Sequence, residues 1–143
     1  MKAYHYTIEH CVESILASGY LEPASTGVPH TEKLVVWFST NAQYEPTASK
    51  ATIGASGVVR RCTDAEMLTL GLVRFTSHTE ALIPWSVLKR RARISAKSQK
   101  QLVTSAREQG ADPMRWYGHI GRLSIAELTL ERFDLLSLQW VAS

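Results

Sequence analysis

The chain has few cysteines, no clustered histidines and no long apolar run. Two cysteines in 143 residues, Cys11 and Cys62, are too few for a disulfide framework and lie outside any zinc-ligand spacing. The five histidines are scattered without ligand spacing, so we expect no metal site. No stretch approaches the roughly 18 consecutive apolar residues of a membrane span, and the N-terminus lacks the apolar run of a signal peptide. The sequence therefore predicts a soluble, cytoplasmic protein that does not contact membranes.

Several well-known functional motifs are also missing. There is no phosphate-binding loop, glycine-rich dinucleotide motif, nucleophile elbow, zinc-protease helix or calcium-binding loop. Hydrophobic residues make up 45% of the chain and charged residues 20%, close to the globular average, which excludes extensive disorder. A chain of this length fits one ordinary domain, so we expect a single domain over residues 1–143.

The residue pattern predicts strands and helices in irregular alternation. Residues 2–7 alternate as in a strand, apolar residues at helical spacing favour a helix over 9–18, and the apolar run 34–39 is typical of a buried strand. Further along we expect a short helix after a capping box at 63–66, a strand over 70–77, helical structure over 84–109, and closing strands over 123–130 and 135–141. This order predicts an α+β fold.

The positive charge is unevenly distributed. The net charge is +3, yet seven bases and no acid lie between Ala81 and Arg107. If residues 89–100 form one helix, three- and four-residue spacing places Arg90, Arg93, Lys97 and Lys100 in one cationic stripe. This stripe predicts contact with nucleic acid or an acidic protein, and a merely solvated helix face is the alternative.

Two groups of polar residues are candidates for a site. Strand alternation places His5 and Thr7 on one side of the first strand, where an imidazole and a hydroxyl suit ribose hydroxyls. Ser39 and Thr40 follow the buried strand, and Tyr44 lies in the loop beyond it. Polar side chains at a strand end are a common place for a site, although they also serve as turn caps.

The opening His-Tyr-Thr strand, the helix ending in Ser-Gly-Tyr-Leu and the later Val-Val-Trp-Phe-Ser-Thr segment resemble the N-terminal half of the ADP-ribosyltransferase superfamily. The resemblance implies a bent or split, antiparallel-rich sheet flanked by helices, with His5 in a central strand. It also implies that His5 and Thr7 lie against the ribose of NAD, that Ser39 and Thr40 lie beside the nicotinamide, and that Tyr44 or Trp37 stacks on it.

The resemblance further implies a glutamate on a late strand that stabilises positive charge on the ribose. Glu127 is the natural choice because it falls in the predicted strand 123–130. The other candidates are Glu131, Glu80 and Glu45. An arginine is expected to hold the diphosphate, and the candidates for this role are Arg60, Arg61 and Arg74.

The implied function is NAD-dependent transfer of ADP-ribose to a protein or a nucleic acid, with Glu127 and His5 as catalytic residues. Two alternatives remain open. One is a non-catalytic, basic binding module or inhibitor that docks on nucleic acid or an acidic protein. The other is an RNA 2′-phosphotransferase-like enzyme, which is similar in its His-containing first strand and needs a set of phosphate-binding residues.

Overall fold

The computed structural model describes residues 1–143 and is built on a seven-stranded sheet. All neighbouring strands are antiparallel, and their order is β11-β10-β6-β1-β3-β8-β7. The strands are β1 (Lys2–Ile8), β3 (Val35–Ser39), β6 (Leu72–His78), β7 (Ile83–Pro84), β8 (Trp116–Ile120), β10 (Thr129–Asp134) and β11 (Gln139–Ala142). The α+β class is confirmed, and β1, which carries His5, is the middle strand of the sheet.

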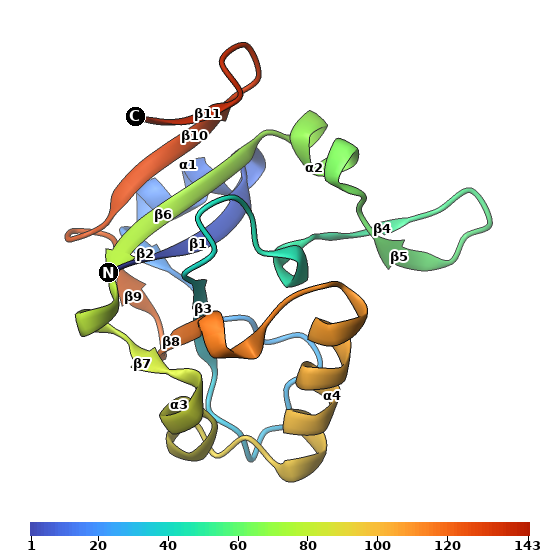
Figure 1. Cartoon of the computed structure of the whole chain (residues 1–143), viewed down its shortest axis with the longest axis vertical. Helices are drawn as coiled ribbons and strands as arrows, with labels where there is room; N and C mark the ends of the chain where they lie inside the picture. The colour runs from blue at the N-terminus through green and yellow to red at the C-terminus, as the bar shows by residue number, and fades with distance from the viewer.

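Two short ribbons and four α-helices complete the fold. β2 (Tyr20–Leu21) pairs with β9 (Leu123–Ser124), and β4 (Ala51–Ile53) pairs with β5 (Val59–Arg61) in a hairpin that projects from the body (Figure 1). The helices are α1 (Glu9–Ser18), α2 (Asp64–Leu70), α3 (Trp85–Arg91) and α4 (Ala96–Glu108), with short 3₁₀ turns η1 (Pro46–Ala48), η2 (Thr79–Ala81) and η3 (Pro113–Arg115). None of the helices has both the length and the apolar character needed to cross a bilayer.

Local sequence signals set several of these boundaries. α1 spans the residues that the pattern predicted and ends at Gly19, whose φ of 80° lies in the left-handed region that glycine adopts without strain. The predicted capping box opens α2, because the Thr63 side chain accepts from the backbone of Glu66 and the Glu66 side chain accepts from the backbone of Thr63. The interactions that set these helix ends involve residues close together in the sequence, so the sequence alone predicts the ends.

The sheet opens between its two central strands. β1 pairs with β6 along its whole length, from Lys2 to Ile8, but it pairs with β3 only at Tyr4 and Ser39. Beyond that pair the two strands diverge. The ring of His5 crosses the opening and bonds to the backbone carbonyl of Trp37 at 2.8 Å. This opening positions the candidate site.

Different helices cover the two faces of the sheet. On one face Phe38 and Phe75 form a core with Leu21, and Ile15 of α1 packs against it. On the other face Trp85 and Leu88 of α3 form a core with Trp116 of β8, and α4 adds Ala106. Figure 1 shows α3 and α4 at the end of the molecule where β7 and β8 lie.

The predicted helical structure over 84–109 is divided into two helices, because the chain turns between α3 and α4. Ala92 and Ile94 are buried in this turn, and Arg93 between them has a φ of 57°. Ser95 then caps α4 by accepting a hydrogen bond from the backbone of Ser98. Burial of two apolar side chains within the three residues before a good N-cap favours a turn over one continuous helix.

The predicted closing strands are also wrong in their bounds. Residues 123–130 are divided between β9 and β10, and a turn between them contains Glu127. Ile125 and Leu128 pack on the core from this turn, so their apolar spacing does not require a strand. Of residues 135–141, only the last three belong to β11, since Asp134 holds a tight turn by accepting hydrogen bonds from Leu136 and Ser137.

Candidate functional site

A cavity of about 290 Å³ lies where β1 and β3 diverge. Its walls come from β1, β3, the segment around η1, the end of β5, α4 and the start of β8. It is lined by five aromatic side chains (Tyr4, Tyr6, Trp37, Phe38 and Trp116) and by three charged residues (Glu45, Lys50 and Arg61). His5 and Ser39, both expected from the sequence, also line it.

His5 is held in the neutral form with one nitrogen available. Its Nδ1 lies 2.8 Å from the carbonyl oxygen of Trp37. A carbonyl oxygen only accepts, so Nδ1 carries the proton and Nε2 is left as an acceptor. Burial lowers the pKa of His5 from 6.5 to about 4, although the bond to Trp37 opposes the shift. At neutral pH the ring therefore accepts, rather than donates, at Nε2.

Glu45 presents a carboxylate with one free oxygen. The residue is only 6% exposed, and its Oε2 accepts from the backbone nitrogen of Thr47 at 3.2 Å and from its hydroxyl at 2.5 Å. Its Oε1 accepts no hydrogen bond, and no basic group lies within 4 Å. Pro46, at the first position of η1, fixes the backbone where Glu45 caps this turn. Glu45 is thus a fixed and unpaired carboxylate in the cavity wall.

Three side chains from three strands fix the segment that leads to Glu45. They donate to three consecutive backbone carbonyls: Tyr6 to Asn41, Arg74 to Ala42 at 2.6 Å, and Trp140 to Gln43 at 3.2 Å. The donors belong to β1, β6 and β11. Directional bonds at successive residues leave the segment little freedom. The position of Glu45 therefore depends on the whole left half of the strand order, β11-β10-β6-β1.

Arg74 is itself held by Glu131. Its Nε lies 3.0 Å from Oε1 and its Nη2 3.4 Å from Oε2, while the Thr76 hydroxyl donates to Oε1 at 2.7 Å. The guanidinium also packs on the rings of Tyr4 and Trp140, 4.0 and 4.4 Å from their centroids. Burial raises the pKa of Glu131, but the hydrogen bonds from Arg74 and Thr76 outweigh it and the net pKa is lowered. Glu131 is therefore ionised, with both oxygens occupied.

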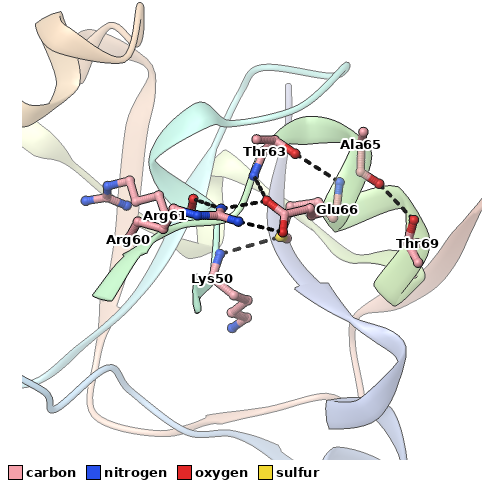
Figure 2. Close-up of polar contacts among 8 residues, drawn as sticks. Lys50, Arg60, Arg61, Thr63, Ala65, Glu66 and Thr69 are labelled. Atoms are coloured by element: carbon pink, nitrogen blue, oxygen red, sulfur yellow. Dashed lines mark hydrogen bonds and ion pairs between the residues drawn. The ribbon is translucent and has the colours of Figure 1, made fainter. Parts of the chain in front are cut away.

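The three arginines suggested for a diphosphate have different positions. Arg74 is buried, and Arg60 makes two hydrogen bonds to Glu66, at 2.7 and 3.1 Å (Figure 2). Arg61 lines the cavity, where its Nη2 reaches the Ser105 hydroxyl at 3.4 Å. Lys50, which the sequence analysis did not select, lines it as well, and its side chain points away from the Arg60–Glu66 pair in Figure 2. Two cations thus remain for an anionic ligand.

Three residues predicted to bind the cofactor lie outside this cavity. Thr7 is 2% exposed, enclosed in β1 opposite Val73, because the sheet is continuous on that side. Thr40 follows the strand but does not line the cavity. Tyr44 packs edge-on against Tyr6 with ring centroids 5.4 Å apart and shares a hydrogen bond with Ser49, so it belongs to a small core. Strand alternation predicts which face of the sheet a side chain lies on. It does not predict where two strands separate and leave a cavity between them.

Three of the four predicted glutamates, Glu131 among them, also lie outside the cavity. Glu127 is exposed in the turn before β10, so its placement on a strand is wrong. Glu80 is exposed and pairs with the N-terminal amino group at 3.6 Å. Glu45 is the glutamate that lines the cavity. The sequence Glu-Pro-Thr could have indicated Glu45, because a capping residue before a proline in the first turn has a fixed backbone.

The basic residues of the 89–100 segment do not form one helical stripe. Arg90 ends α3, Arg93 lies in the turn, and Lys97 and Lys100 lie on α4. None of the seven bases between Lys89 and Arg107 has a carboxylate within 4 Å. The segment keeps its unpaired positive charge, but on two helices.

The geometry contains no cluster of three or more His, Cys, Asp or Glu side chains that could hold a metal ion. No protein-family model, curated protein or solved structure matches this chain.

Proposed function

We propose that the protein binds NAD in the cavity between β1 and β3 and transfers the ADP-ribosyl group to an acceptor. The observation that carries the proposal is one arrangement: the free oxygen of Glu45 and the neutral His5 line an aromatic-walled cavity that also contains Lys50 and Arg61. An NAD molecule offers a flat cationic ring, ribose hydroxyls and a diphosphate. The cavity has a matching group for each.

The binding roles follow from the chemistry of each side chain. The rings of Tyr4 and Trp37 suit the flat nicotinamide, whose positive charge favours an aromatic face. The free Nε2 of His5 accepts a hydrogen bond from a ribose hydroxyl. Arg61 and Lys50 pair with the diphosphate oxygens through charge-assisted hydrogen bonds.

The chemical role falls to Glu45. The bond between ribose C1′ and the nicotinamide nitrogen breaks, and its electron pair returns to the pyridine ring. Positive charge then develops on the ribose, and a fixed carboxylate stabilises it more in the transition state than in the ground state. A lone pair of the acceptor forms the new bond at C1′, and the acceptor proton passes to solvent. Glu131 cannot take this role, because Arg74 and Thr76 occupy its oxygens.

The resemblance to the ADP-ribosyltransferase superfamily supports the proposal at two positions. His5 and Ser39 line one cavity at the junction of β1 and β3, as the resemblance implies. The glutamate differs: the resemblance implies a late-strand residue, and the cavity instead has Glu45, in the segment after β3. The proposal therefore rests on the cavity more than on the resemblance.

The test combines calorimetric titration with NAD and a measurement of nicotinamide release. We expect E45Q to keep NAD affinity and to lose about 10²- to 10³-fold in rate, the scale for one preorganised electrostatic group. The matched control is E127Q, the same change at an exposed turn, which should leave both quantities unchanged. Absence of NAD binding by the wild-type protein at millimolar concentration would refute the proposal.

A second variant separates binding from chemistry. H5A removes the acceptor that faces the ribose, so we expect weaker NAD affinity, because that hydrogen bond forms in the ground state. Full activity in E45Q would reject Glu45 as the carboxylate without rejecting NAD binding.

One other function has a specific observation in its favour. The unpaired bases of α3 and α4 suit a module that binds a polyanion without catalysis. An RNA 2′-phosphotransferase-like activity has less support, because Lys50 and Arg61 are the only cationic side chains that line the cavity. Release of nicotinamide distinguishes the proposed function from the non-catalytic module. Release that does not require a 2′-phosphorylated RNA distinguishes it from the phosphotransferase.

A further inference from the structure

A second cavity, of about 300 Å³, adjoins the first. The two share Trp37, Leu102 and Ser105 as lining residues. The second cavity lies between α4 and the loop before β3, and its walls are rich in uncharged hydrogen-bonding groups, including Thr26, Ser98 and Gln101. Its volume is at the lower end of the range for small-molecule sites, about 300–1,000 Å³. A flat polar group in this cavity would lie beside the proposed NAD site.

Glu32 closes one side of the second cavity. Its Oε2 accepts from the hydroxyls of Ser98 at 2.6 Å and Ser95 at 3.1 Å, which ties the loop to the first turn of α4. Its Oε1 accepts no hydrogen bond. The free oxygen is an acceptor for an amino group, in the way that a carboxylate reads the amino group of a base.

The exposed face of α4 is cationic and adjoins this cavity. Lys97, Lys100, Thr104 and Arg107 are exposed at three- and four-residue spacing, which places them on one face of the helix. None of its three bases has a carboxylate partner within 4 Å. Gln101 is exposed between them and also lines the second cavity. An extended anionic ligand that lies along the exposed face of α4 therefore passes the second cavity.

We infer that a single-stranded nucleic acid is the acceptor: its phosphates lie along the exposed face of α4, and one base enters the second cavity beside the NAD site. The acceptor role rests on the proposed function. In that reaction a nitrogen or oxygen of the base bonds to ribose C1′, the nicotinamide leaves with the electron pair of its bond, and the base proton passes to solvent.

The composition of the two surfaces favours this partner over others. A row of lysine and arginine side chains without carboxylate partners suits the evenly spaced phosphates of a nucleic acid, and each phosphate contact releases counterions. The ring of Trp37 and the amide and hydroxyl groups nearby suit a base that is already unstacked, as in a single strand. A duplex keeps its bases paired, and an acidic protein has no flat ring with amino and carbonyl edges for the cavity.

The first test measures binding of fluorescently labelled 12-nucleotide DNA and RNA single strands over a range of salt concentrations. We expect K97Q/K100Q to weaken binding at least 10-fold at 0.1 M salt and to reduce the log–log salt slope by about 1.4, the amount for two phosphate contacts of a single strand. The control K2Q/R122Q makes the same change in net charge at two exposed residues outside α3 and α4, and should bind as the wild type does.

The second test concerns the cavity. T26W places a large side chain at its wall, and Thr26 does not line the first cavity. In the wild type, a single 2-aminopurine in the strand should change its fluorescence as it leaves the stack and meets Trp37. T26W should abolish this change, keep the salt slope and keep NAD binding.

The outcomes separate the two proposals. NAD binding without salt-dependent binding of either oligonucleotide would overturn the inference and leave the proposed function standing. Equal competition by poly-glutamate would overturn it in favour of an acidic protein. Oligonucleotide binding that T26W alters, in a protein that does not bind NAD, would support docking on α4 and overturn the proposed function and the acceptor role.

Discussion

The two sides of the open sheet are built by different means. In the β11-β10-β6-β1 half, the interior of one face is polar: Arg74 is buried and bonded to Glu131, which also accepts from Thr76. In the β3-β8-β7 half, the same face is aromatic. Trp37, Trp85 and Trp116 contact one another there, with ring centroids 5.4 to 6.0 Å apart.

The polar half positions a functional side chain, whereas the aromatic half mainly stabilises the fold. Hydrogen bonds are directional, and in the polar half they end on the backbone of residues 41–43 and so fix Glu45. Aromatic packing is less directional and removes a large apolar area from water, so it stabilises the half that carries α3 and α4. The cavity lies between the halves. The polar half fixes Glu45 and contributes Tyr4, and the aromatic half contributes Trp37 and Trp116.

The largest expected effect is on the aromatic half. Trp85 is 6% exposed and does not line the cavity between β1 and β3. We expect W85A to lower the free energy of unfolding by about 3–5 kcal/mol, the usual cost of removing a buried aromatic side chain. Urea denaturation measures the change, and W85F should recover part of the loss. A cost below about 1 kcal/mol in W85A would show that the three tryptophans do not form the stabilising core of this half.

The next effect is on the polar half, where one change should cost stability and a second should restore it. E131L leaves the buried Arg74 guanidinium without its carboxylate, so we expect a loss of about 3 kcal/mol. The double variant R74M/E131L removes both charges and should recover most of that loss. It still lacks the donor to Ala42, so amide hydrogen exchange near Glu45 should be faster than in the wild type. Unchanged exchange in the double variant would mean that Arg74 does not position this segment.

The smallest effect concerns His5, which joins the two halves through Trp37. Its pKa is about 4 in the folded protein and 6.5 in the unfolded chain, so between these values the unfolded state binds more protons. Stability should therefore rise as the pH increases from about 4 to 6.5 and level off above. The whole shift corresponds to about 3 kcal/mol, of which about 2 kcal/mol falls between pH 4.5 and pH 7. In H5Q this contribution should be missing from the difference between pH 4.5 and pH 7. Equal pH dependence in both proteins would show that burial does not hold His5 neutral.

Elements whose cause is local were predictable from the sequence. The helix 9–18, its stop at Gly19 and the capping box at Thr63 depend on residues within a few positions of one another. The buried strand that ends at Ser39 was predictable because an apolar run of this length is typical of a strand covered on both faces. The break at residues 92–95 was not, because the spacing of the bases continues through it while burial of Ala92 and Ile94 ends the helix.

The site itself was predictable only in part. The amino-acid sequence by itself determined the residue types that are available near the first and third strands, His5 and Ser39 among them, because strand position and polarity are readable locally. Tertiary structure decided which carboxylate faces the cavity. Glu131 and Glu45 have the same side chain. Arg74 and Thr76 occupy the oxygens of Glu131, whereas the turn after β3 leaves one oxygen of Glu45 free. The physical reason is that a carboxylate's chemistry depends on its hydrogen-bond partners, and those partners lie up to 57 positions away in the chain.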